Sequence, residues 1–203
     1  MANILSVKVK NRKIKPLEDL FKKWAHLNDL YIKALKEDSP YFYSERTNCG
    51  MINAAAYATD RFVALEELKV DRENIGGHVN NGGNPRYDLY LYDTKEKSEY
   101  IIETKLSWTR REIEQKIADA ENQIKSISSE YHGDINLAMV FAVVGFNDIN
   151  DDILKNHINE LDNIETCLTV HYYPDSTRNL HGSGGFANYI YPGVSILMRV
   201  VDQ

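Results

Sequence analysis

Three charged side chains stand in two neighbouring apolar segments of the sequence, within RYDLYLYDTKEKSEYIIETKLSW at residues 86–108. They are Asp88, Glu103 and Lys105. Mg²⁺ prefers carboxylates, waters and phosphate oxygens as ligands, and a bound Mg²⁺ lowers the pKa of a water and stabilises charge on a phosphate. An ammonium beside the site can orient that water or offset the charge of the transition state. Two acids followed by a base therefore indicate metal-assisted chemistry on a phosphate ester.

The two segments predict a β-hairpin, with strands at 87–92 and 100–106 joined by the polar turn DTKEKSE. Side chains alternate between the two faces of a strand, so Glu103 and Lys105 share a face. If the strands are antiparallel neighbours, Asp88 lies across from this pair on the same face. The hairpin is therefore expected to gather all three charges.

A plainer interpretation is a hairpin with one solvated face, on which Glu103 and Lys105 pair with neighbouring charges. The context favours the first interpretation. Ile101 and Ile102 directly precede Glu103, so this strand is expected to be largely buried. Buried charges are rare without a partner or a metal.

Asp88, a turn, and Glu103-Thr104-Lys105 at the end of an apolar strand resemble the PD-(D/E)xK nuclease superfamily, the restriction endonuclease-like proteins. The resemblance covers about residues 43–200 and extends to an uncharacterised bacterial branch. The Pro of the family's PD is not adjacent to the acid here, because Pro85 stands three residues before Asp88. The resemblance implies a core of helix, three-stranded meander, helix and strand.

The resemblance also implies the roles of the motif residues. Asp88 and Glu103, with the backbone carbonyl of Thr104, are expected to hold Mg²⁺, for which Mn²⁺ can substitute. Lys105 is expected to position water or stabilise the transition state. The implied function is a divalent-metal-dependent nuclease that hydrolyses phosphodiester bonds in DNA through a metal-activated water.

The family often carries another acid on its first core helix, and Glu45 in YSERTNCGMINAAAYATD is the candidate here. It is expected to act as an accessory metal ligand with a catalytic role. An acid in the first turn of a helix also interacts favourably with the helix dipole, and both interpretations stay open. Asp60 and Glu66 are lesser candidates for the same role.

Four further residues are candidates for substrate contact: Arg86, Arg110, Arg111 and Gln123. Some family members carry a Gln on the helix after the ExK strand, which favours Gln123; it can equally be an exposed helix residue. Arg86 can contact a phosphate or face water in a turn. The two adjacent arginines can contact a nucleic-acid backbone or be solvated at a helix start.

The remaining pattern predicts an α/β fold, a mixed β-sheet flanked by helices with an extra N-terminal helix. One strand of the meander has no clear counterpart in the sequence. A capping box of Thr109 and Glu112 is expected to open the helix that follows the hairpin. The expected helices are 17–36, 45–68, 109–130 and 151–161, and the further strands are 137–146, 168–173 and 194–201.

Residues 1–16 carry five basic and no acidic side chains, and we expect a basic N-terminal arm followed by a single nuclease-like domain at 17–203. The arm is either a solvated tail or a segment that contacts phosphates. The chain as a whole carries a net charge of −6, so nucleic-acid contact would be confined to a patch or supplied by a partner. That partner could be a second copy or another protein.

Two cysteines without CxxC spacing fit a reducing compartment, and the N-terminal residues show no secretory pattern. Because there is also no apolar run long enough to span a bilayer, we expect a cytoplasmic bacterial protein with no membrane contact. Two other functions remain open. One is an inactive binding or assembly protein of the same fold that acts with a partner. The other is an unrelated α/β protein in which the hairpin has no site.

Aromatic side chains gather towards the C-terminus, at Tyr172, Tyr173, Phe186, Tyr189 and Tyr191. Such residues can form core packing. They can also stack bases at a substrate cleft.

Overall fold

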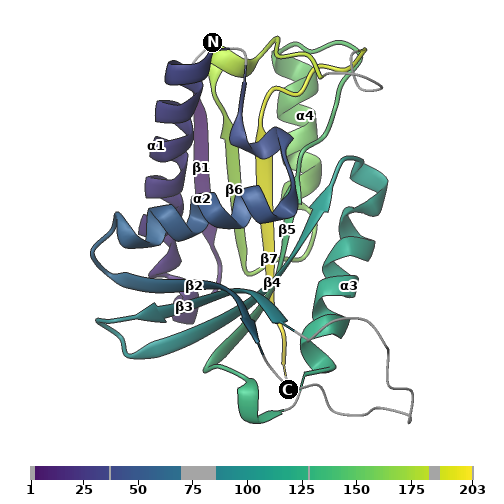
Figure 1. The fold of residues 1–203 in the computed structure, drawn as a ribbon. Helices are drawn as coiled ribbons and strands as arrows, with labels where there is room; N and C mark the ends of the chain where they lie inside the picture. Colours follow the sequence, from purple (N-terminus) through teal and green to yellow (C-terminus); the bar gives the residue numbers. More distant parts are fainter. Residues whose placement is uncertain (1–2, 37, 70–85, 128, 183–187, 203) are drawn as a thin grey trace.

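The structure, a computed structural model, describes residues 3–36, 38–69, 86–127, 129–182 and 188–202 (Figure 1). In these residues seven strands form one mixed sheet in the order β1-β6-β7-β5-β4-β3-β2. The strands are β1 (Ile4–Val9), β2 (Phe62–Lys69), β3 (Arg86–Asp93), β4 (Ser98–Ser107), β5 (Ile135–Ala142), β6 (Leu168–Tyr173) and β7 (Val194–Val200). Only β4 and β5 are parallel among the adjacent pairs.

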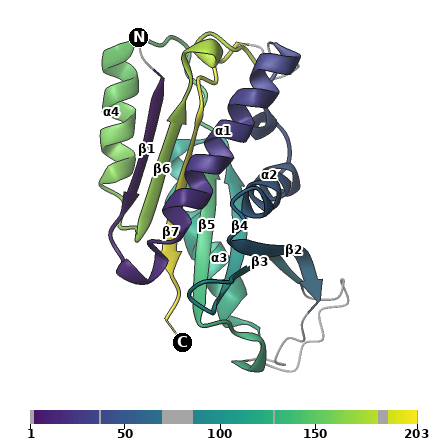
Figure 2. The ribbon, with the colours of Figure 1, turned by 90° about the vertical axis from the view of Figure 1, so that its left-hand side faces the viewer.

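Four α-helices of the described chain cover this sheet on both faces (Figure 2). They are α1 (Leu17–Leu35), α2 (Glu45–Tyr57), α3 (Ile113–Lys125) and α4 (Asp151–Asp162). Apolar residues of α1 and α2 form the larger core with one face, whereas α3 packs on the other face together with Leu161 of α4. The central strand β5 is buried along its whole length, as its nearly uninterrupted apolar sequence predicts.

The predicted α/β class with an N-terminal helix is therefore confirmed. The hairpin, α1, α4, β6 and β7 lie at or within a few residues of their expected bounds. The Gly-rich stretches at 76–77 and 80–85, Pro85, and Phe186 lie outside the described residues.

The predicted helix at 45–68 is wrong in its second half. The helix ends at Tyr57, a turn at Asp60 adopts a left-handed φ of 52°, and the chain returns as β2. FVALEELK has good helix formers, but its first four residues alternate buried and exposed, and its backbone pairs with β3. Tertiary pairing outweighs the local helix propensity of ALEEL.

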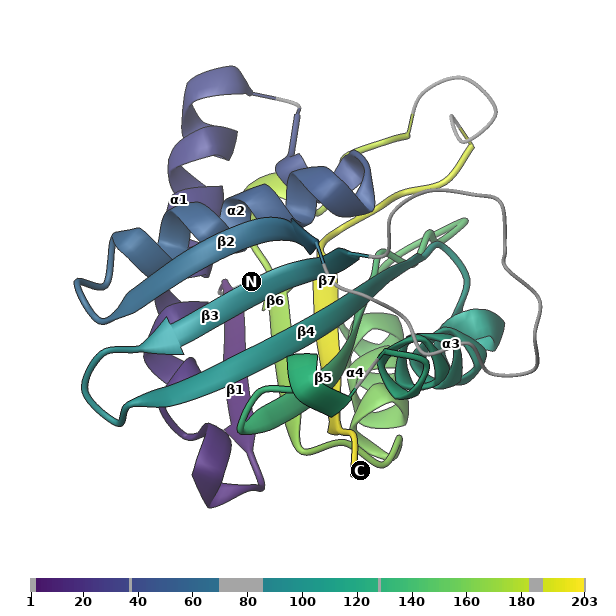
Figure 3. The same cartoon turned by 60° about the horizontal axis from the view of Figure 1, so that its bottom comes forward.

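With β2 identified, β2, β3 and β4 form an antiparallel meander, which lies side by side in Figure 3 with α2 along one side and α3 beside β4. The helix α3 then carries the chain to β5, which pairs parallel to β4. This crossover places the ends of β3 and β4 between α2 and α3.

The expectation of a solvated N-terminal tail is wrong for much of residues 1–16. Residues 4–9 form the edge strand β1, which pairs with β6 along its whole length, and Ile14 is fully buried. Two basic side chains of this segment form ion pairs, Lys8 with Asp162 and Lys15 with Glu18.

The helix after the hairpin also differs from its prediction. Thr109 makes no capping hydrogen bond with its side chain, so the capping box is wrong, and a short 3-10 turn at Arg110–Glu112 precedes α3. The helix ends at Lys125 rather than near residue 130. The Ser126 hydroxyl donates to the carbonyl of Gln123 at 2.7 Å and satisfies one acceptor of the last turn.

None of the described helices is both long and apolar enough to cross a membrane.

Candidate active site

The ends of β3 and β4 hold the Asp88 carboxylate in a defined place. The Thr104 backbone N–H donates to Asp88 Oδ2 at 2.7 Å, and the Thr104 hydroxyl donates to the same oxygen at 3.0 Å. Hydrogen bonds to an ionised carboxylate are strong and directional. Asp88 is therefore fixed beside the ExK strand, but through Thr104 rather than directly across from Glu103 and Lys105 on their shared face.

Lys105 contacts the two residues that precede it in the motif. Its Nζ donates to Glu103 Oε1 at 3.0 Å and to the Thr104 carbonyl oxygen at 2.7 Å. Glu103 and Thr104 are fully buried, whereas the Lys105 side chain is 20% exposed. The carbonyl that we expected as a metal ligand thus accepts from the ammonium in this structure.

Simple alternation along β3 does not account for this geometry. The residue opposite Asp88 on β2 is Glu67, which has a left-handed φ of 52°. Tyr87 packs with Ile101 on the face of α3, whereas Leu89 belongs to the core on the other face. The alternation of side chains between the two faces of β3 is therefore interrupted at Asp88, and this lets the Asp88 carboxylate reach Thr104.

Glu103 carries the most perturbed carboxyl of the site. Burial raises its pKa to about 8, and the nearby Asp88 carboxyl adds to the increase, while Lys105 opposes it. Its Oε1 accepts from Lys105, and its buried Oε2 receives no hydrogen bond from the described residues, although a protonated Glu103 can share its proton with Asp88. A buried acceptor without a donor is energetically unfavourable, and a cation at this oxygen would satisfy it.

Glu45 lies at this site, at the first position of α2. The Ser44 side chain accepts from the Thr47 N–H and opens the helix there. Burial and then the Asp88 carboxylate raise the pKa of Glu45, while Lys105, the Leu106 backbone and Thr104 lower it. Its carboxyl is therefore close to the motif residues, and its place in the first turn also favours the helix dipole.

A stripe along α2 faces the same site, and the sequence reading missed two of its members. Cys49 and Asn53 follow Glu45 at intervals of four, so the three side chains share one face of the helix. Cys49 Sγ lies 3.4 Å from the Thr104 hydroxyl, and Asn53 Nδ2 donates to Glu66 Oε1 at 2.8 Å. Only this spacing could have revealed them.

Of the two lesser acidic candidates, only Glu66 lies near the site. Glu66 is near the site, because it contributes with Asp88 and Glu45 to the raised pKa of the Cys49 thiol, which burial brings to about 12. Asp60 is exposed in the turn between α2 and β2.

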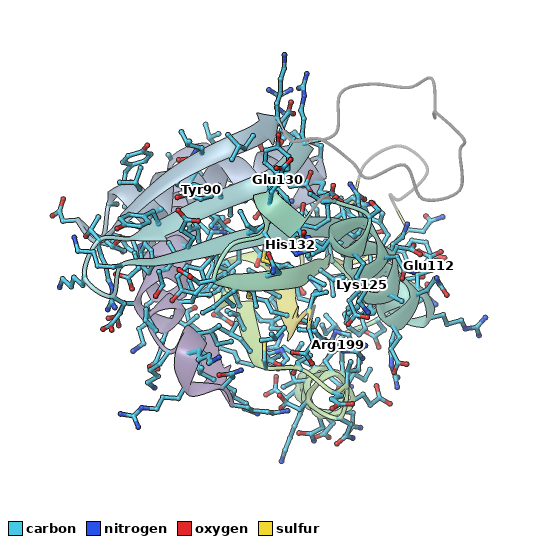
Figure 4. All side chains as sticks on the ribbon, turned by 90° about the horizontal axis from the view of Figure 1, so that it is seen from below. Tyr90, Glu112, Lys125, Glu130, His132 and Arg199 are labelled. Carbon is cyan, nitrogen blue, oxygen red and sulfur yellow. The ribbon has the colours of Figure 1, made fainter. Side chains whose placement is uncertain are left out.

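Gln123 is half-buried near the end of α3. Glu121, about 160° away around the helix by its 100° step, reaches Arg199 of β7 at 3.6 Å. In Figure 4 Arg199 of β7 is labelled below Lys125, the last residue of α3, and Tyr90 of β3 is labelled at the upper left. No side-chain hydrogen bond of Gln123 is present within the described residues. Lys116 lies two helical turns earlier on the same side of α3 and is half-buried.

Two of the three arginine candidates, Arg86 and Arg110, form ion pairs with acids. Arg86 pairs with Glu67, which Arg46 also approaches at 3.4 Å. Arg110 pairs with Glu160 of α4. Arg111 is exposed and has no hydrogen-bond or ion-pair partner among the described residues.

The donor set fits a divalent cation of the magnesium class. Asp88 and Glu103 offer carboxylate oxygens, and the unpartnered Glu103 Oε2 is the atom that a cation would satisfy. In the described part of the chain, however, no three His, Cys, Asp or Glu side chains form a preformed metal site.

Comparisons with known proteins add nothing to this geometry: neither a family model, nor a curated protein, nor a solved structure matches the chain. The functional argument therefore depends on the contacts described above.

Proposed function

We propose that this protein is a divalent-metal-dependent nuclease of the PD-(D/E)xK type that hydrolyses phosphodiester bonds in DNA. The observation that carries the proposal is the convergence of Asp88, Glu103 and Lys105, with one buried oxygen of Glu103 lacking a partner. The order α2, β2-β3-β4, α3, β5 supports it, because it follows the order of the core that the resemblance implies.

Asp88 and Glu103 would hold the cation, Mg²⁺ or Mn²⁺, with the Thr104 carbonyl and Glu45 as further oxygen donors. When bound, the cation would supply a water of lowered pKa and charge stabilisation at the phosphate. Thr104 orients Asp88 through two hydrogen bonds, and burial of Glu103 excludes bulk water from its side.

Lys105 is the group that would meet the reacting phosphate. Its partly exposed ammonium can orient the attacking water or offset charge that develops on phosphate oxygens. In the reaction, the water oxygen forms a bond to phosphorus, the bond from phosphorus to one ester oxygen breaks, and that oxygen leaves as a hydroxyl after gaining a proton. A second proton of the water is lost to solvent or to a nearby base.

One observation favours a second candidate, a binding or assembly protein without catalysis. Lys105 already pairs with Glu103 and with the Thr104 carbonyl, so the charges also form a closed structural network. In that case no metal would bind.

The test is cleavage of supercoiled plasmid, linear duplex and single-stranded DNA with Mg²⁺ or Mn²⁺, beside EDTA. Lys105→Ala removes the ammonium, and Lys95→Ala, an exposed lysine in the turn of the same hairpin, is the matched control. We expect metal-dependent cleavage by the wild type and by Lys95→Ala, and none by Lys105→Ala. Absence of cleavage together with absence of metal binding would favour the second candidate.

A further inference from the structure

A hollow of about 740 Å³ opens where β4 ends, and aromatic and basic side chains line it. Its lining includes Trp108, Arg110, Arg111, Gly145, Tyr189 and Tyr191. The volume is within the range of small-molecule sites. The hollow thus combines flat apolar surfaces with cationic groups.

The floor of the hollow is closely packed. The rings of Trp108 and Tyr191 meet edge to face with centroids 5.8 Å apart, and Phe42 packs on Tyr191 in the same way at 5.5 Å. A Cβ on Gly145 would come within 2.8 Å of the Tyr191 ring, so only glycine allows this approach. Tyr191 is buried, whereas Tyr189 is 40% exposed at the rim.

One cation at the hollow, Arg111, is available to an anionic ligand. Arg110 is paired with Glu160, and Glu112 also lines the hollow. Arg111 is exposed and has no ion-pair partner in the described chain, so its guanidinium can take an external phosphate.

The hollow is next to the candidate active site. Trp108 follows Lys105 by three residues at the end of the same strand, about 10 Å along the chain. The Leu106 backbone between them lies beside Glu45. Alternation places Lys105 and Trp108 on opposite faces of β4, with Trp108 packed against the core under α2. A nucleotide next to a phosphate at Lys105 would therefore reach the hollow around the end of the strand.

We propose that the hollow binds an unpaired base of a DNA strand, which stacks on Tyr189 and Trp108 while Arg111 contacts a neighbouring phosphate. Aromatic surfaces beside cationic groups are how proteins hold single-stranded nucleic acid. The inference depends on the proposed nuclease function and deepens it, because it makes single-stranded or locally unpaired DNA the preferred substrate class.

Binding is tested with the full chain in EDTA, where no metal-dependent cleavage can occur. Two probes of equal length are used, a single-stranded oligothymidylate and a strand of the same phosphates in which the bases are replaced by abasic sites. Intrinsic fluorescence reports on stacking, because the chain has two tryptophans and the other, Trp24, is fully buried. The oligothymidylate is expected to quench the Trp108 emission and to bind at least about tenfold more tightly than the abasic strand.

Variants separate the base contact from the phosphate contact. Tyr189→Ala should weaken oligothymidylate binding by about tenfold and leave the abasic strand unaffected. Arg111→Ala should weaken both strands alike. Tyr57→Ala, which removes an exposed tyrosine of α2 outside the hollow, should change neither.

Two results would overturn the inference: equal affinity of the wild-type chain for both strands, or unchanged oligothymidylate binding in Tyr189→Ala. These results are distinct from a failure of the proposed function. Metal-dependent cleavage by a protein that shows no preference for strands with bases would refute base binding in the hollow and leave the proposed nuclease function standing. Base-selective binding with no cleavage of any DNA would support base binding in the hollow and refute the proposed nuclease function.

Discussion

Two buried polar clusters of this protein differ in one respect. Around Ser195, three side chains are joined by hydrogen bonds: Ser195 Oγ meets His171 Nδ1 and the Tyr173 hydroxyl, each at 2.8 Å, and His171 Nε2 lies 3.2 Å from Asp162, whereas Nε2 of the neighbouring His157 has no partner in the described residues. At Glu103, one buried oxygen has none in the described chain.

The first cluster has the residue types of a catalytic Ser-His-Asp arrangement, but it cannot act as one. Ser195 and His171 are fully buried, and the Tyr173 hydroxyl is also hydrogen-bonded to Ser195 Oγ. A nucleophile must be within reach of a substrate. The comparison teaches that a closed network stabilises the fold, whereas an incomplete one at a strand end indicates a binding site.

The largest effect is expected from Lys105→Ala. Removing one charge-stabilising group from a catalytic site typically costs about 10²–10³-fold in rate. Metal-dependent DNA cleavage should fall by at least this factor, measured as initial rates on labelled DNA. Equal rates for wild type and variant would contradict the comparison, because the cluster at Glu103 would then have only a structural role, like the cluster at Ser195.

Acid should lower the stability of the protein through His157, which lies beside the cluster around Ser195. Burial lowers the pKa of His157, whose ring meets Tyr173 edge to face, to about 4 from an ordinary value of 6.5. A lowered histidine pKa stabilises the fold above pH 6.5, and this contribution is lost as the pH falls towards 4, up to about 3 kcal/mol.

The check is urea unfolding of wild type and His157→Leu at pH 7 and pH 4.5. The wild type should lose more stability between the two values than the variant does. Parallel losses would show that His157 does not carry the acid sensitivity.

Ser195→Ala should lower the free energy of unfolding by about 1–3 kcal/mol, because His171 and Tyr173 lose a buried partner. Its rate of DNA cleavage should stay that of the wild type. Ser129→Ala, at an exposed position, is the matched control and should alter neither quantity. A large loss of cleavage in folded Ser195→Ala would reassign the active site.

The smallest effect is expected at the surface of the same cluster. Lys8 pairs with Asp162, but its side chain is 48% exposed. Lys8→Ala should therefore change the free energy of unfolding by less than about 1 kcal/mol, measured by urea unfolding at low and high salt. A larger loss would mean that Lys8 belongs to the closed network.

The sequence predicted the hairpin and its charged residues because local patterns specify them. An apolar strand with Glu103 directly after Ile101 and Ile102 leaves few alternatives. β1 was missed because its partner β6 is remote in sequence, and no local pattern marks an edge strand. β2 was missed because ALEEL favours a helix until β3 is available to pair with it.

Within the site, Glu45 was predicted, but Cys49 and Asn53 were not. Their spacing has meaning only once α2 is known to end at Tyr57 and to lie over the ends of β3 and β4. The change of facing at Asp88 depends on the left-handed backbone of Glu67 on the neighbouring strand, which no pattern in β3 itself reveals.

The most direct test of the metal site is calorimetric titration of the protein with Mn²⁺ and Mg²⁺, in wild type, Glu103→Gln and Lys95→Ala. The account predicts saturable binding to wild type and Lys95→Ala that is lost in Glu103→Gln, because the amide cannot replace the carboxylate as a charged ligand. No binding to the wild type, or equal binding to Glu103→Gln, would contradict it.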